Sequence, residues 1–162
     1  MALIIETGTG VANANSYISK AELESYAEAR NVSLASYSAA SIEGAIVVAC
    51  TDFLNTYYTI KGEALTATQG LQIPTDEVGV TSAIKQAACA ASIMQLQGLL
   101  MVDAASVASG LIASERKKLD VLETEVTYVQ GSQQTYKRKT PLIDNLMRPH
   151  IINGGFGMAR VL

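Results

Sequence analysis

The sequence offers few side chains that could perform acid–base or nucleophilic chemistry. His150 is the single histidine among 162 residues, and it lies in a Pro-His turn near the C-terminus. A catalytic triad would have to use it as the base, and the chain has no Gly-x-Ser-x-Gly nucleophile elbow. The carboxylate pairs Glu22/Glu24 and Glu123/Glu125 are each two residues apart, and on an exposed strand the second pair serves solubility and edge protection. We therefore expect a protein that is not an enzyme.

Metal and cofactor sites are not expected either. Cys50 and Cys89 lie in apolar stretches of helical period, and no second cysteine or histidine stands at ligand spacing, so we interpret both as small buried hydrophobes. The Gly-Thr-Gly in the loop at residues 7–15 lacks the third glycine of a dinucleotide loop and the Gly-Lys-Ser/Thr of a P-loop. Asp76 and Glu77 could bind a cation, but turn chemistry explains an aspartate there equally well. We expect no metal and no cofactor.

Positive charge is concentrated in the last third of the chain. Residues 1–110 hold 4 basic and 10 acidic side chains (4 − 10 = −6), residues 111–162 hold 8 and 5 (8 − 5 = +3), and the net charge is −3. Six of the twelve basic residues form two triplets, Arg116-Lys117-Lys118 and Lys137-Arg138-Lys139. Such triplets are either solvated loops and strand edges or surfaces that face DNA or an acidic partner.

Hydrophobic periodicity predicts a mainly α protein, a helical bundle of about four helices with a short β-strand or hairpin near residues 114–129 and extended termini. Ser19 and Glu22 form a capping box that opens the first helix, and Thr140-Pro141 is typical of a helix start. The expected helices span about residues 19–30, 38–60 or 41–60, 80–101 and 140–148.

The apolar spacing also predicts which faces are buried. The stripe of the second helix is Ile42, Ile46, Ala49, Cys50, Phe53 and Tyr57. The third helix should bury Val80, Ile84, Ala87, Ala88, Ala91 and Met94 or Leu96, and its other small residues permit close contact on two sides. We place Tyr17, Tyr26 and Tyr57 at the edge of the core.

Residues 122–129 alternate in the manner of a β-strand with one wetter face. Residues 114–121 either pair with this strand or pair with a neighbouring subunit. We expect one helical domain with this β insertion over residues 1–149 and a flexible C-terminal arm over residues 150–162, which is rich in glycine.

An alanine-rich, aromatic-poor composition gives a thin core, which favours sharing a core with other subunits. The N-terminus has no signal peptide pattern, and the alanine-rich run around residues 86–102 is shorter than a bilayer span. We expect a soluble protein with no membrane association, made in a reducing cytoplasm.

Several stretches, read in order, resemble a family of small tailed-phage proteins labelled "putative DnaT-like ssDNA-binding protein", which lie among phage structural genes and are similar to head–tail connectors. The matching stretches are ETGTGV at 6–11, NSYIS at 15–19, ACTDFL at 49–54, TQGL at 68–71, VTSAIKQAAC at 80–89, ETEVTY at 123–128 and PLIDNLMRP at 141–149. They cover nearly the whole chain, although this chain continues about a dozen residues beyond the last of them.

The resemblance implies a virion protein of the phage neck. It implies a helical adaptor that forms a ring, a dodecamer, with copies of itself beneath the portal protein. The ring would extend the channel for double-stranded DNA, without sequence-specific binding, and would dock the next neck or tail protein, a stopper or terminator.

Connectors of this kind often dock on the portal through C-terminal segments. The expected portal contact, with Phe156 as its anchor, is Pro149, His150, Ile151, Ile152, Phe156, Met158, Arg160 and Leu162. The residues expected to face the channel or DNA are Arg116, Lys117, Lys118, Lys137, Arg138 and Lys139.

The alternative is a single-stranded-DNA-binding protein of phage replication or recombination. The same six basic residues would then contact phosphates, and Tyr128 and Tyr136 would stack on bases. The acidic total and the lack of aromatics interleaved on a basic face argue against it.

Overall fold

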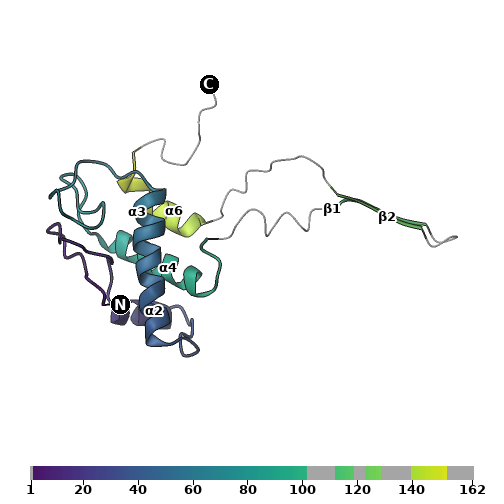
Figure 1. Ribbon diagram of the computed structural model, residues 1–162, viewed down its shortest axis with the longest axis horizontal. Helices are drawn as coiled ribbons and strands as arrows, with labels where there is room; N and C mark the ends of the chain where they lie inside the picture. The colour runs from purple at the N-terminus through teal and green to yellow at the C-terminus, as the bar shows by residue number, and fades with distance from the viewer. Residues whose placement is uncertain (1, 102–111, 119–122, 129–139, 153–162) are drawn as a thin grey trace, which may run out of the picture. The chain divides into compact units, whose positions relative to one another are not determined.

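The computed structural model describes residues 2–101, 112–118, 123–128 and 140–152 (Figure 1). The chain divides into two compact units. The first comprises Met1–Leu100 together with Thr140–Leu162, and the second comprises Met101–Lys139.

The first unit is helical, as the sequence predicts. Its described residues form four helices: α1 (Lys20–Glu28), a long helix, α4 (Ser82–Leu96) and α6 (Pro141–Met147). The long helix consists of α2 (Ala39–Val47), the π-helical segment η1 (Val48–Leu54) and α3 (Asn55–Tyr57). A 3-10 turn, η3 (Arg148–His150), follows α6. None of the described helices is long and apolar enough to cross a membrane.

Helix α4 is the centre of the helical unit. It packs against α1, α2, η1 and α6, and Figure 1 shows it beside the long helix and α6. Its buried residues are mostly small: Ile84, Ala87, Ala88, Cys89, Ala90, Ala91, Ser92 and Ile93. The predicted face is therefore confirmed for Ile84 and the three alanines, while Met94 and Leu96 are half-buried. Because small side chains let helices approach closely, much of this surface is used inside the chain itself.

The buried stripe predicted for the long helix is wrong at its last residue, Tyr57, whose ring stacks on Phe53 at the edge of the core. Tyr57 is 39% exposed, whereas Tyr58 is 1% exposed. The reason is the π-helical segment, in which the Asn55 N–H donates to the Cys50 carbonyl, five residues back. Such a turn accommodates an extra residue, so positions beyond it shift around the helix axis by one. The rest of the predicted stripe, from Ile42 to Phe53, is buried or lies against the core.

The third helix ends at Leu96 rather than near residue 101. Gly98 adopts a positive φ of 69° there. The N–H of Gly98 donates to Gln95 and that of Leu99 to Met94, at 3.0 and 2.8 Å. This is a Schellman motif, which closes the last turn and directs the chain away from the helix axis.

The second unit contains an antiparallel hairpin of β1 (Ile112–Lys118) and β2 (Glu123–Tyr128). The expected strand pair is thus formed within one chain. The ladder has an irregularity between Ile112 and Ser114 and is regular from Ser114 onward, with Arg116 opposite Glu125 and Lys118 opposite Glu123.

Candidate functional site

The chain after α6 is held against the end of the long helix. Ile60 and Ile151 form an antiparallel bridge, in which the Lys61 N–H donates to the His150 carbonyl and the Ile152 N–H donates to the Thr59 carbonyl, both at 3.0 Å. The Lys61 ammonium also donates to the Pro149 carbonyl at 2.9 Å. We call Pro149, His150, Ile151 and Ile152 the C-terminal anchor.

The four residues of the C-terminal anchor differ in exposure. Ile151 is buried in the core at 3% exposure, whereas Ile152 is 49% exposed and Pro149 is also exposed. The domain boundary expected at residue 149 falls inside this anchor. The other expected portal-contact residues, Phe156, Met158, Arg160 and Leu162, lie outside the described residues.

His150 links the anchor to the start of α4. Its Nε2 lies 3.4 Å from the Thr81 hydroxyl, and Thr81 caps α4 by accepting the Ile84 N–H. Partial burial, and then the positive charge of Lys61, hold the pKa of His150 below its usual value. The contact with Thr81 ties the C-terminal anchor to the cap of α4.

A second tie joins α6 to the long helix. The Tyr58 hydroxyl donates to the Asp144 carboxylate at 2.6 Å. Thr140 occupies the predicted N-cap position, but its hydroxyl bonds Asp144 at 3.4 Å rather than a backbone N–H. Burial, together with the Asp144 carboxylate, raises the pKa of Tyr58 far above its usual range. Asp144 thus fixes the helix that leads into the anchor.

The Gly-Thr-Gly loop is filled by a side chain of the protein. The Glu6 carboxylate, 1% exposed, accepts the N–H groups of Gly8, Thr9, Gly10 and Val11 at 2.7 to 3.0 Å. Successive backbone N–H groups of this kind form an anion-binding nest. The motif comparison that argues against a phosphate loop does not predict this contact, and its only signal in the sequence is an acidic residue, Glu6, two positions before Gly8.

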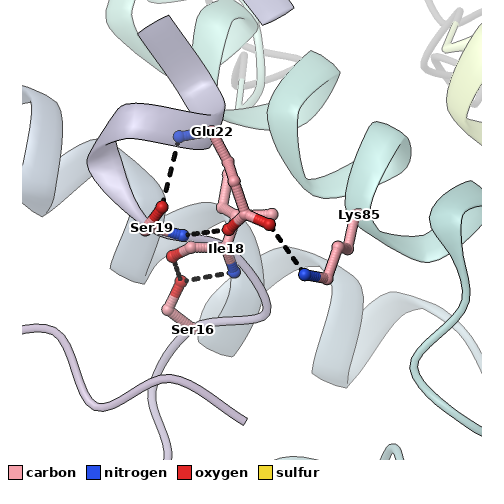
Figure 2. Close-up of polar contacts among 5 residues, drawn as sticks. All are labelled: Ser16, Ile18, Ser19, Glu22 and Lys85. Carbon is pink, nitrogen blue, oxygen red and sulfur yellow. Dashed lines mark hydrogen bonds and ion pairs between the residues drawn. The ribbon is translucent and has the colours of Figure 1, made fainter. Parts of the chain in front are cut away.

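Helix α1 is joined to α4 by an ion pair at the predicted capping box. Figure 2 shows the Ser19 hydroxyl accepting the Glu22 N–H, while the Glu22 carboxylate accepts the Ser19 N–H and meets the Lys85 ammonium at 2.7 Å. Burial alone would raise the pKa of Glu22, but the hydrogen bonds from Lys85 and Ser19 outweigh it and keep that pKa below its usual value. The capping box is confirmed, and its glutamate also joins two helices.

The described part of the chain gives little support for a reactive cysteine or for a metal site. Burial raises the pKa of Cys50 to about 11 and that of Cys89 to about 12, so both thiols are protonated at neutral pH. The Asp76 carboxylate accepts the Glu63 N–H at 2.7 Å, so it joins two segments 13 residues apart rather than capping its own turn. Among the described residues, no three His, Cys, Asp or Glu side chains are grouped to hold a metal ion.

The basic triplets do not form one described surface. Arg116, Lys117 and Lys118 lie in β1, where the register sets the first opposite Glu125 and the last opposite Glu123. Lys137, Arg138, Lys139 and the predicted stacking residue Tyr136 lie outside the described residues. Tyr128, the other predicted stacking residue, is the last residue of β2.

Fold and contacts together define a small, mainly helical domain with a separate β hairpin and an anchored C-terminal segment. The model of the family described as "Putative DnaT-like ssDNA binding protein" matches residues 1–162, so the chain belongs to this family. No curated protein and no solved structure matches the chain.

Proposed function

We propose that this protein is a head-to-tail adaptor of a tailed phage, a structural protein without catalytic activity that forms a ring under the portal. The observation that carries the proposal is the C-terminal anchor. It fixes the backbone up to the half-exposed Ile152, the residue directly before the segment 153–162. The sequence beyond this point contains Phe156 among three glycines.

Fixing the start of a glycine-rich segment helps it to bind. A docking segment loses conformational freedom when it binds, and this loss lowers its affinity. Because the backbone is already ordered through residue 152, part of that loss is avoided. Phe156 would then occupy a groove of the portal, as large aromatic side chains commonly do at interfaces.

In the assembled virion, the ring would continue the channel for double-stranded DNA below the portal. It would contact DNA without reading its sequence, and its far side would meet the stopper, terminator or tail protein. The resemblance to connector proteins supports a dodecamer. The proposed location is the virion neck.

The test uses the purified portal protein of the same phage and light scattering. The intact chain should join the portal in a fixed ratio. A chain that ends at residue 152 keeps the anchor and should lose most portal binding, and Phe156→Ala should weaken it by at least tenfold, since hot-spot aromatics contribute about 2 kcal/mol or more. Ile4→Ala, which removes an exposed apolar side chain near the other terminus, is the matched control. Unchanged binding of the truncated chain would refute docking through this segment.

Binding of single-stranded DNA is the second candidate, and the description of the family favours it. The register of the hairpin argues against it, because two residues of the first basic triplet have glutamates opposite them. If the chain fails to bind the portal but binds single-stranded DNA with an affinity that falls steeply with salt, the adaptor proposal is wrong and this one is right.

A further inference from the structure

The β1–β2 hairpin has edges that could accept another strand. Among the described residues, the two strands pair only with each other, in a two-stranded sheet. A two-stranded hairpin is only marginally stable in water without further strands or packing. The outer edge of each strand also presents backbone N–H and C=O groups with which another strand can pair. A further strand at either edge would stabilise the hairpin.

The two edges carry opposite charge. Strand β1 contains Arg116, Lys117 and Lys118 with one glutamate, Glu115, giving 3 − 1 = +2. Strand β2 contains two glutamates and no basic residue, giving −2. Charges of like sign directly opposite each other destabilise a sheet, and charges of opposite sign stabilise it. Two β1 edges, or two β2 edges, would therefore repel, whereas a β1 edge and a β2 edge attract.

We propose that hairpins of neighbouring copies of this chain join edge to edge, β1 of one copy beside β2 of the next. This contact would join the subunits of the proposed ring, so the inference rests on the proposed function. With the strands along the ring axis, copies related by rotation have parallel hairpins, so β1 of one lies antiparallel to β2 of its neighbour, as it does to its own β2. If the neighbour repeats the register of the hairpin, Arg116 and Lys118 each have a glutamate position on both sides.

This contact selects a ring over a two-fold dimer. A two-fold interface would match each edge with itself, which the charges disfavour. A head-to-tail contact joins two different edges, so a row of copies has a free β1 edge at one end and a free β2 edge at the other. The row closes into a ring when successive rotations add up to a full turn. Arg116 and Lys118, candidates for the DNA channel on sequence grounds, are thereby assigned to the contact between subunits.

Three variants test the contact, and a mixture of the first two separates contacts between copies from contacts within a hairpin. The first variant makes β1 acidic (Arg116→Glu with Lys118→Glu). The second makes β2 basic (Glu123→Lys with Glu125→Lys). The third variant carries all four substitutions. Mass is measured by light scattering over a concentration series at low salt, for each variant and for a 1:1 mixture of the first two.

The first and second variants should each associate at least about tenfold more weakly than the natural chain, because two attractive pairs become repulsive. Their mixture should regain the mass of the natural assembly, since the acidic β1 of one matches the basic β2 of the other. A mixture that stays at monomer mass overturns the proposal, whatever the third variant does, because the charges would then act only inside each hairpin. A natural chain that remains monomeric throughout the series overturns it too.

The outcome is independent of portal binding. Self-association with the expected charge dependence, but without portal binding, would keep this inference and refute the adaptor function. A portal complex formed equally well by the natural chain and the first two variants would keep the adaptor function and refute this inference.

Discussion

The caged carboxylate of Glu6 gives the sharpest test of how the N-terminal loop is held. In Glu6→Gln the side chain keeps its length and one oxygen but loses its charge. The oxygen can still accept the N–H groups of Gly8, Thr9 and Gly10, which now bond Oε1. The new amide nitrogen must face the N–H of Val11, which now donates to Oε2 at 2.7 Å.

The expected loss follows from these four bonds. Hydrogen bonds to a charged acceptor are about twice as strong as neutral ones, so three weakened bonds lose about 0.5 kcal/mol each or more. A buried N–H without an acceptor costs about 1–3 kcal/mol. Because the buried glutamine also avoids the cost of burying a charge, we subtract about 1 kcal/mol and expect a net destabilisation of about 1.5–3.5 kcal/mol.

Urea unfolding followed by circular dichroism measures this difference, and Glu28→Gln is the matched control. Glu28 is exposed at the end of α1, so its substitution should change the free energy of unfolding by less than about 0.5 kcal/mol. At about 2–4 °C per kcal/mol, a loss near 3 kcal/mol lowers Tm by about 6–12 °C. If Glu6→Gln and Glu28→Gln behave alike, the nest does not hold the loop and the reasoning is refuted.

Other contacts make three further predictions. Gly70→Ala should destabilise the fold by about 2 kcal/mol or more, because the new Cβ would lie 2.2 Å from a backbone oxygen. Gly44→Ala, whose Cβ would have nothing within 4 Å, should be neutral or stabilising, and urea unfolding compares the two variants. The raised pKa of Tyr58 implies stability that is complete below pH 10 and declines above it, and in Tyr58→Phe this alkaline decline should shrink, as pH-dependent melting will show. NMR titration should find the pKa of His150 below 6.5 and higher in Lys61→Met, with stability falling as the pH drops below 6.5; an unshifted pKa would contradict the described burial.

Signals that act over a few residues made much of the fold predictable. The capping box of Ser19 and Glu22 depends on four consecutive residues, and it is found as expected. Helix α4 and its buried face follow from a period that repeats along one segment. The second strand of the hairpin follows from alternation over residues 122–129, and of the two pairings left open for residues 114–121 the structure has the one within the chain.

The errors have identifiable causes. The predicted end of α4, near residue 101, is wrong: the helix ends at Leu96, and Gly98 is a local signal for this end. The burial of Tyr58 in place of Tyr57 had no local signal, because nothing in the apolar spacing distinguishes a π-helical turn from an α-helical one. The partner of Tyr58, Asp144, is 86 positions away along the chain.

For the candidate site, the sequence provided residue types and the fold provided neighbours. The portal contact and the role of the basic triplets stay predictions. Only the register shows that Arg116 lies opposite Glu125. Only the folded chain shows that the segment after α6 is ordered through Ile152 by the backbone of residues 59–61.

By itself, the sequence determined the mainly helical class, the starts of the helices and most of the buried faces. These depend on capping and periodicity, which are properties of short stretches of chain. The tertiary structure alone decided that Lys85 pairs with Glu22, that Asp144 accepts a hydrogen bond from Tyr58, and that Ile151 forms a β-bridge with Ile60. Each of these contacts joins segments far apart in sequence, and their meeting depends on how the helices pack.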